Sequence, residues 1–192
     1  MKKATAKRIL EIAREVGALL YGDFTLSSGK KSTYFFDGKR LTASPEGAYQ
    51  VGKAVFDKLA GLDVDAIGGV PVGGYPIVTA VALVSHLEGK PIPSFMVREV
   101  PKEHGTKRQF EGYFKEGVKV AIVDDVITTG GSVRKTIEAV EAAKGKVVKI
   151  ITIVDRHEGG SDQLKKDGYD FTALIDLWPS GEATIGGALG KG

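Results

Sequence analysis

The sequence predicts an α/β fold in which a central, mostly parallel sheet is flanked by helices within a single domain. Short runs of β-branched residues alternate with segments of helical periodicity along most of the chain, a pattern that implies right-handed crossovers between parallel strands. Two strand-to-helix connections are rich in glycine, at residues 68–74 and 128–132. The length of 192 residues suits one domain with a sizeable core.

The first part of the chain predicts a helix followed by a hairpin. Apolar residues recur at helical spacing through residues 4–20, with charged residues on the other faces. Residues 24–40 hold two β-prone pieces around the turn Ser-Ser-Gly-Lys-Lys, which favours a hairpin. The aromatic run Tyr34, Phe35 and Phe36 is compatible with core packing, which aromatic residues mostly serve, and with a platform for a planar ligand.

Helices and strands continue to alternate through the middle of the chain. We expect Pro45 to open a helix over residues 45–60, since proline suits the first helical turn. The elements predicted next are a strand at 64–69, a helix at 75–87, a strand at 92–97 and a polar stretch at 98–110. The polar stretch has the composition of a solvated loop.

The stretch 120–133, VAIVDDVITTGGSV, combines a strand, an acidic pair and a helix start. Four apolar residues lead to Asp124 and Asp125, which we expect at the end of a buried parallel strand, where ligands of open α/β sheets bind. The turn 128–132 can offer backbone N–H groups and hydroxyls to an anion, because glycine permits close approach and a helix N-terminus favours negative charge. The stretch therefore predicts a phosphate site beside a site for sugar hydroxyls.

The last part of the chain predicts two further strands, at 146–155 and 171–175, with Gly145 as the C-cap of the preceding helix. The glycine-rich tail is left unassigned. Three strand ends carry polar or glycine-rich turns, at Gly69, Asp124 and Asp155. If those strands are neighbours, their ends meet at one cleft.

Composition excludes several classes of function. The net charge of +3 argues against a general nucleic-acid binder. The chain has no cysteine, so a metal would need oxygen ligands. No segment approaches the about 20 apolar residues of a membrane span or the apolar core of a signal peptide, and we expect a cytoplasmic protein. A nucleoside triphosphatase is disfavoured, since the sequence lacks a GxxxxGK run followed by serine or threonine.

The segment VAIVDDVITTGGSV closely resembles the signature of type I phosphoribosyltransferases, which bind phosphoribosyl pyrophosphate. Within that superfamily, FTLSSGKKSTYFFDGKR and REVPKEHGTKRQFEG look like segments of the orotate phosphoribosyltransferase family. The resemblance runs from the first helix to Arg156. It implies a type I phosphoribosyltransferase-like fold, with a small hood formed by residues 1–40 and the C-terminal segment.

The same resemblance implies an activity, a cofactor and partners. The activity is transfer of a 5-phosphoribosyl group from phosphoribosyl pyrophosphate to orotate, in pyrimidine biosynthesis. The implied cofactor is Mg²⁺, held mainly through the substrate rather than by dedicated protein ligands. The implied assembly is a homodimer in which the 98–110 loop of one subunit closes over its neighbour's site, without nucleic acid or membrane.

Residues that match the family's motifs receive roles from this resemblance. The residues expected to carry catalysis are Lys102, Asp124 and Asp125. The residues expected at the pyrophosphate are Arg98, Lys102, His104, Val72 and Gly73. The residues expected around the phosphoribosyl group are Asp124, Asp125, Val126, Ile127, Thr128, Thr129, Gly130, Gly131 and Ser132. The residues expected at orotate are Thr128, Arg156, Phe35 and Phe36.

Two positions depart from the family's pattern. Glu99 stands where the family typically has a lysine at the pyrophosphate, a role that a carboxylate cannot take. Ser27 stands where many members have a lysine, for which Lys30 or Lys31 could compensate. The sequence does not identify a replacement for the first of these contacts.

Two other interpretations stay open. A salvage phosphoribosyltransferase for another base would share the signature but should lack the FTLSSG and KEHG segments. A regulatory module would keep the phosphoribosyl site without chemistry, which the intact acidic pair and the cationic loop disfavour. Of the remaining histidines, we expect His157 in solvent and His86 on the outside of a helix.

Overall fold

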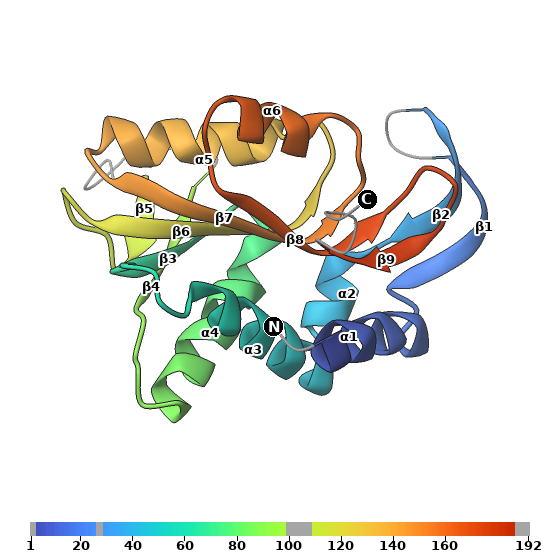
Figure 1. The fold of residues 1–192 in the computed structure, drawn as a ribbon, viewed down its shortest axis with the longest axis horizontal. Coiled ribbons are helices and arrows are strands. Elements are labelled where there is room, and N and C mark those ends of the chain that lie inside the picture. Colours follow the sequence, from blue (N-terminus) through green and yellow to red (C-terminus); the bar gives the residue numbers. More distant parts are fainter. Residues whose placement is uncertain (1–2, 26–28, 99–108, 187–192) are drawn as a thin grey trace.

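A computed structural model describes residues 3–25, 29–98 and 109–186 (Figure 1). The helices are α1 Lys3–Glu15, α2 Gly38–Thr42, α3 Pro45–Leu59, α4 Gly74–Leu87, α5 Gly131–Ala142 and α6 Gly160–Lys166. The strands are β1 Leu19–Thr25, β2 Lys31–Phe36, β3 Ala66–Gly69, β4 Ser94–Val97, β5 Phe110–Gly112, β6 Lys119–Ile127, β7 Lys146–Asp155, β8 Phe171–Leu177 and β9 Ala183–Ile185. Among these helices none is long and apolar enough to cross a membrane.

The central sheet of the described residues has seven strands in the order β5-β4-β3-β6-β7-β8-β9. The inner strands β4, β3, β6, β7 and β8 pair in parallel, and the short edge strands β5 and β9 pair antiparallel. The predicted α/β fold with a mostly parallel sheet is therefore confirmed. The hairpin of β1 and β2 forms a separate antiparallel sheet.

Helices cover both faces of the sheet, with α5 and α6 on one side and α1 to α4 on the other (Figure 1). Alternate residues of β6 supply the two cores: Val120 and Ile122 pack on the α5 side, whereas Ala121 and Val123 pack on the α3 and α4 side. This two-sided burial explains why the strand is a continuous β-branched run.

The N-terminal helix is shorter than predicted, because it ends at Glu15 rather than near Leu20. Gly17 has a φ of +67°, and the N–H of Ala18 donates to the Ala13 carbonyl at 2.7 Å, which is a glycine-terminated helix end. Leu19 and Leu20 consequently belong to β1. The second half of the predicted hairpin also differs, since residues 38–42 form α2.

The C-terminal elements contain the remaining differences from the prediction. The helices and strands α6, β5 and β9 were not predicted. The left-handed position after α5 is Lys144, with a φ of +60°, and not Gly145. Gly145 is needed for packing instead, because a Cβ there would lie 2.9 Å from Val140 Cγ1 and 3.1 Å from Phe114 Cζ.

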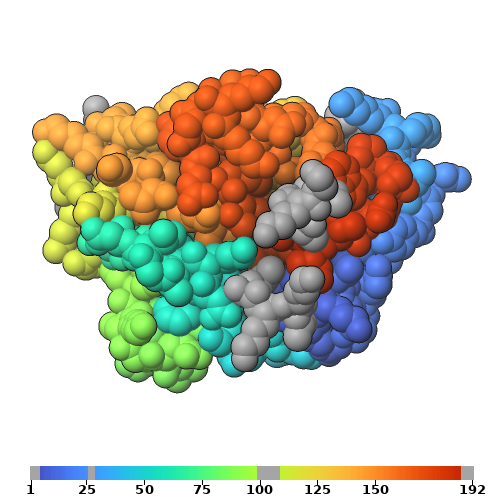
Figure 2. Space-filling view, in the orientation of Figure 1, coloured from blue at the N-terminus to red at the C-terminus, as the bar shows by residue number. Residues whose placement is uncertain are grey.

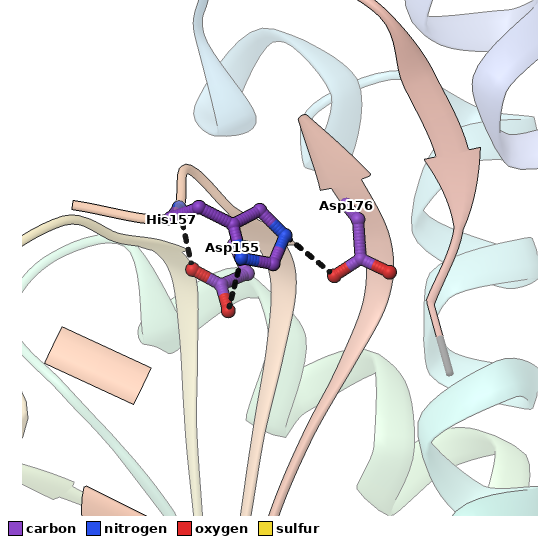
Figure 3. A group of neighbouring side chains, drawn as sticks. All are labelled: Asp155, His157 and Asp176. Atoms are coloured by element: carbon purple, nitrogen blue, oxygen red, sulfur yellow. Dashed lines mark hydrogen bonds and ion pairs between the residues drawn. The ribbon is translucent and has the colours of Figure 1, made fainter. Parts of the chain in front are cut away.

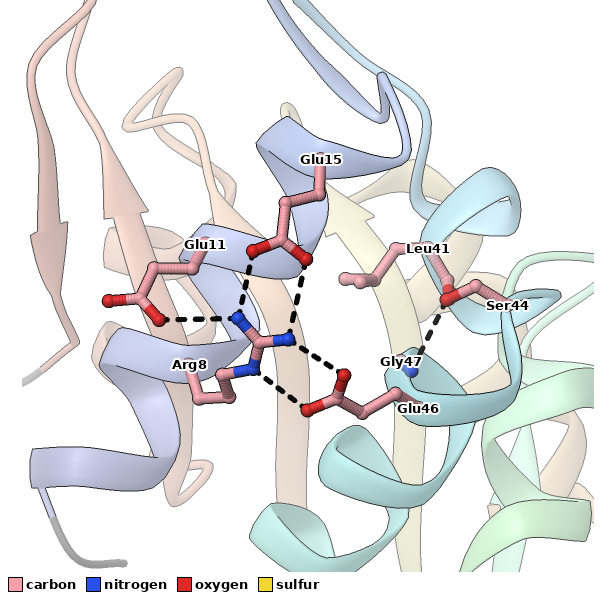
Figure 4. A network of polar contacts seen from close by, with 7 residues as sticks. All are labelled: Arg8, Glu11, Glu15, Leu41, Ser44, Glu46 and Gly47. Carbon is pink, nitrogen blue, oxygen red and sulfur yellow. Dashed lines mark hydrogen bonds and ion pairs between the residues drawn. The ribbon is translucent and has the colours of Figure 1, made fainter.

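Two contacts hold the N-terminal segment against the rest of the molecule. Arg8 on α1 forms ion pairs with Glu15 at 2.8 Å and with Glu46 at the start of α3 at 2.7 Å (Figure 4). On the other side, the hairpin lies against the C-terminal β8–β9 segment (Figure 2), where the Tyr34 hydroxyl donates to the Leu177 carbonyl at 3.4 Å. The β1–β2 hairpin and the strands β8 and β9 are therefore in contact although they lie far apart in the sequence.

Candidate active site

The carboxyl ends of β3, β6 and β7 lie side by side, as the cleft hypothesis required. Gly69 pairs with Val123, and Ile127 pairs with Asp155. Beyond the strands, the N–H of Arg156 donates to the Ile127 carbonyl at 3.1 Å, and the N–H of Gly160 donates to the Thr128 carbonyl at 2.9 Å. The turn after β6 and the turn after β7 are thus hydrogen-bonded to each other.

The acidic pair lies within β6, not after it as predicted. The ten-residue strand β7 extends the pairing past the aspartates to Ile127. Asp124 and Asp125 are 7% and 9% exposed. The Asp124 Oδ1 accepts the backbone N–H of Asp125 at 2.9 Å, and the Asp125 Oδ2 lies 3.8 Å from Lys39 Nζ.

Two glycines on neighbouring elements make room for the carboxylates. A Cβ at Gly38 would lie 2.6 Å from Asp125 Oδ2, and a Cβ at Gly73 would lie 2.9 Å from Asp124 Oδ1. Any other residue at either position would force the acidic side chains to move. The glycine-rich turn after β3 therefore contributes space to the site. Of its predicted pyrophosphate residues, Gly73 is buried and Val72 is 59% exposed.

The surroundings of Asp124 disfavour its ionised form. Burial, and then the negative charge of Asp125, raise the pKa of Asp124 to about 8. The hydrogen bond from the Asp125 backbone N–H and then the charge of Lys39 partly oppose this rise in the pKa of Asp124. Asp124 therefore tends to hold a proton, and positive charge brought close to it would favour release of that proton.

The turn after β6 has the form of an anion cradle. A cavity of about 130 Å³ is lined by Asp124, Val126, Ile127, Thr128, Thr129, Gly130, Gly131, Ser132 and Val133. Gly130 has a φ of +81° and precedes α5, where it has no side chain to occupy the N–H groups of the first turn. The structure thus brings the predicted phosphoribosyl residues, apart from Asp125, into one small cavity, with Asp125 next along the strand.

A larger cavity of about 670 Å³ opens beside the cradle. Its lining residues are Asp23, Phe24, Lys30, Lys31, Ser32, Thr33, Tyr34, Arg156, Glu158 and Pro179. The Arg156 guanidinium lies over the Tyr34 ring at 4.9 Å, donates to the Tyr34 hydroxyl at 3.2 Å and pairs with Glu158 at 3.3 Å. This cavity therefore contains a positive planar group between the hairpin and the end of β7.

The aromatic residues of the hairpin are placed differently from the prediction. Phe35 is 40% exposed and packs beside Phe24, and Phe36 packs against the core; neither lines the cavity. Tyr34 was not among the residues expected at orotate, yet it is 2% exposed and lines the 670 Å³ cavity. Strand alternation, which places Tyr34 and Phe35 on opposite faces, was the available signal.

The predicted pyrophosphate loop is only partly described. The Arg98 Nε donates to Glu111 at 2.8 Å, and Arg98, Gln109, Pro71 and Ser132 help to line a cavity of about 350 Å³. Lys102, His104 and Glu99 lie outside the described residues, as does Ser27. Arg98 therefore stands between the loop, the turn after β3 and the start of α5.

His157 is not in solvent, contrary to the prediction, whereas His86 is exposed on α4 as expected. The His157 ring lies between two carboxylates, with Nε2 at 3.1 Å from Asp176 Oδ1 and Nδ1 at 3.8 Å from Asp155 Oδ2 (Figure 3). Its other face stacks on Trp178, at 3.8 Å between ring centroids and 3° between planes. Neighbouring strands β7 and β8 supply both acids, which the sequence alone did not place together.

The fold and the site define a phosphoribosyltransferase: residues 38–182 match the family model of the phosphoribosyl transferase domain. An orotate phosphoribosyltransferase of Aquifex aeolicus is 41% identical to this chain, over 89% of this chain and 90% of that protein. The chain belongs to the orotate phosphoribosyltransferase family.

Solved structures agree with this assignment. The orotate phosphoribosyltransferase of Mycobacterium tuberculosis H37Rv in complex with Fe(III) dicitrate matches with a TM-score of 0.80 and 31% identity, over 90% of this chain and 97% of that one. A structure of the Mycobacterium tuberculosis H37Rv enzyme in complex with 5-phospho-alpha-D-ribosyl 1-diphosphate matches with a TM-score of 0.76 and 28% identity, over 90% and 96%. The resemblance inferred from the motifs is confirmed.

Proposed function

We propose that this chain transfers the 5-phosphoribosyl group of phosphoribosyl pyrophosphate to N1 of orotate, forming orotidine 5′-monophosphate and pyrophosphate in pyrimidine biosynthesis. The observation that carries the proposal is the hydrogen bond from the Arg156 N–H to the Ile127 carbonyl. It joins the anion cradle to the cavity that contains the Arg156 guanidinium. A phosphorylated sugar and a planar anionic base would lie side by side in that arrangement.

The phosphoribosyl group is held by the cradle and the acidic pair. Backbone N–H groups and hydroxyls of residues 128–132 bind the 5′-phosphate, because the start of α5 favours an anion. Asp124 and Asp125 accept hydrogen bonds from the ribose hydroxyls. As the pyrophosphate leaves, positive charge develops on the sugar, and the two fixed carboxylates stabilise it electrostatically. The reaction needs no covalent intermediate, since the residues described around the cradle include no activated nucleophile.

The leaving pyrophosphate is neutralised by the cationic loop. Arg98, at the loop's first residue, already faces the start of α5 in the 350 Å³ cavity. Lys102 and His104 follow on the same loop, and its closure would exclude water. The donor set fits Mg²⁺, because the carboxylates and hydroxyls described at the cradle are oxygen ligands; the ion, when bound, supplies further neutralisation of the pyrophosphate.

Orotate binds in the 670 Å³ cavity between the hairpin and the end of β7. The Arg156 guanidinium suits the acceptor's carboxylate, since it donates two parallel hydrogen bonds to a planar anion. It exchanges its present partner, Glu158, for that carboxylate. The hood of residues 1–40 and the C-terminal segment closes this side of the site, an assignment supported by the contact of Tyr34 with Leu177.

The active form is a dimer that shares the 98–110 loop. An apolar groove of about 540 Å³ runs along α3 and α4, and Tyr49, Leu83 and Leu87 in it are 52%, 61% and 70% exposed. Tyr75 also lines this groove, and its hydroxyl donates to the Val97 carbonyl directly before the loop. A second copy seated on the groove would therefore lie where the loop leaves the sheet.

One assay separates the candidate functions. The protein is incubated with phosphoribosyl pyrophosphate, Mg²⁺ and either orotate or purine bases, and orotate absorbance and pyrophosphate release are followed. We expect turnover with orotate as the base and none with the purine bases. Turnover with a purine would instead support a salvage enzyme, and binding of the donor without turnover of any base would support a regulatory module.

A further inference from the structure

His157 and Trp178 join two turns that form one wall of the 670 Å³ cavity proposed for orotate, called the acceptor cavity below. Arg156 and Glu158 line that cavity, whereas the residue between them, His157, is absent from its lining. In the same way Pro179 lines the cavity, while the preceding Trp178 stacks on His157. The stack therefore lies behind the wall and ties the turn after β7 to the turn after β8.

Polar contacts hold both residues of the stack, at the His157 ring, the His157 backbone and the Trp178 ring. The ring Nε2 of His157 lies 3.1 Å from Asp176 Oδ1, and the backbone N–H of His157 donates to Asp155 Oδ1 at 2.9 Å. The Trp178 Nε1 donates in turn to Thr184 on β9 at 3.2 Å. His157 also has a φ of +53°, a left-handed conformation that histidine tolerates better than most residues. A residue held in that conformation sets the direction of its neighbours on both sides.

The same contacts favour a positioning role over a metal site. Asp155, His157 and Asp176 have ligand-type atoms within 4.8 Å of one another. The two ring nitrogens, however, face different carboxylates across the ring (Figure 3). A single ion could therefore not replace both contacts, whereas a histidine that bridges two acids satisfies all three groups.

We propose that His157 is a positioning residue for the acceptor: clamped between Asp155, Asp176 and Trp178, it holds Arg156 and the cavity wall in the orientation that receives orotate. The proposal rests on the proposed function, because it takes Arg156 to be the orotate ligand. It adds a residue that does not touch the substrate. Loss of the clamp should weaken acceptor binding and leave the phosphoribosyl donor unaffected, since the His157 ring contacts Asp155, Asp176 and Trp178 and none of the residues that line the cradle.

The kinetic test compares His157→Ala with His157→Gln, whose planar amide can still donate to Asp176. His86→Ala, at the exposed histidine on α4, is the matched control. We expect His157→Ala to raise the KM for orotate about tenfold, the scale of one hydrogen bond to a charged group. The KM for phosphoribosyl pyrophosphate should stay unchanged, and His157→Gln should recover most of the loss. Equal rises in both KM values, or no rise in either, would overturn the proposal.

A second measurement is independent of turnover. The Nε–H resonance of Arg156, assigned by its disappearance in Arg156→Lys, reports whether the guanidinium is held against Tyr34. We expect this resonance to broaden in His157→Ala and to persist in His86→Ala. An unchanged resonance in both variants would contradict the proposal that His157 positions Arg156. The stack itself is checked by intrinsic fluorescence, because Trp178 is the one tryptophan of the chain. If the wild type fails to convert orotate, the proposed function fails, and the resonance still decides the clamp.

Discussion

Asp124 and Asp125 form a buried pair of adjacent carboxylates that destabilises the ligand-free protein. Burial disfavours the charged form of Asp124, and the negative charge of Asp125 adds to that cost. The strand holds the pair in place nonetheless, because β6 stays paired with β7 on both sides of Asp125, at Asp124 and at Val126. In the proposed reaction this cost is offset when positive charge develops on the sugar beside the two carboxylates.

Asp124→Asn should make the ligand-free protein more stable at alkaline pH and nearly inactive. The pKa of Asp124 is about 8 in the folded state and 3.8 in the unfolded chain. Between these two pH values the folded state keeps a proton on Asp124 that the unfolded chain has already released. The free energy of unfolding of the wild type therefore falls as pH rises through that window, by at most about 1.4 kcal/mol per pH unit. The variant lacks this loss, so thermal scans should show a higher midpoint than wild type at pH 8 and similar midpoints at about pH 4.

Activity of the same variant should fall about 100-fold or more, because an amide cannot stabilise the cationic sugar. Asp162→Asn, at an exposed aspartate of α6, is the control and should change neither quantity. Equal midpoints for Asp124→Asn and wild type at pH 8 would contradict the role of the buried charge.

At the residue scale, the sequence predicted the groups whose chemistry is local. The acidic pair and the glycine-rich turn act through neighbouring residues of one segment, so one stretch of sequence reveals them. His157 and Tyr34 were misjudged because their surroundings come from distant strands: Asp176 and Trp178 in one case, and Arg156 in the other. Side-chain environments of that kind depend on the order of the strands in the sheet, which a single sequence does not reveal.

At the scale of elements, α1 is attached to the molecule by an apolar face and by one arginine. Ala6, Ile9, Ile12 and Ala13 of this helix are at most 2% exposed. Arg8 adds a bridge to α3, and its hydrogen bond lowers the pKa of Glu46 while the carboxylates hold the pKa of Arg8 above its ordinary range. Because all these charges are at the surface, the bridge should be sensitive to salt.

Arg8→Gln should lower the melting midpoint at low ionic strength by no more than about 4 °C, the scale of a weak surface network in a domain of this size. The difference from wild type should shrink in 1 M salt, since screening already weakens the network there. Lys7→Gln serves as the comparison, because the Lys7 pair with Glu11 is 3.8 Å long and the Lys7 side chain is 76% exposed. A salt-independent decrease for Arg8→Gln would show that packing, not charge, is responsible.

Most long elements were predicted closely, apart from the end of α1, whereas four of the short elements were not predicted. The helix at Pro45 and the strand Lys146–Asp155 agree with their predicted ranges within one residue, because each has many periodic positions. The short elements α2, β5, α6 and β9 have seven residues or fewer and exist through their contacts. Their local sequences carry too few positions to show a period.

At the scale of the whole molecule, the proposed dimer makes two subunits contribute to each site. The groove on α3 and α4 reaches the end of β4, because Tyr75 of the groove donates its hydroxyl to the Val97 carbonyl. If loops are exchanged, an acidic pair and the Lys102 beside it come from different chains. The dimer would then be required for activity and not only for stability.

Two inactive variants should complement each other. Co-expressed Lys102→Ala and Asp125→Asn chains should regain about a quarter of the wild-type activity, because half of randomly formed dimers are mixed and each of these has one intact site. Each variant expressed alone should stay inactive. If the mixture is as inactive as its components, each loop acts on its own subunit.

The hydrogen bonds between the turns after β6 and β7 have a consequence for how the base preference of this fold can change. One wall of the proposed orotate cavity is hydrogen-bonded to the cradle through the Arg156 backbone N–H, so the spacing between the cradle and the Arg156 backbone is fixed. The opposite wall belongs to the β1–β2 hairpin, a separate sheet. Substitutions in the hairpin can therefore reshape the cavity for a different acceptor base without changing the geometry of the cradle. Attempts to change the base preference should begin in the hairpin.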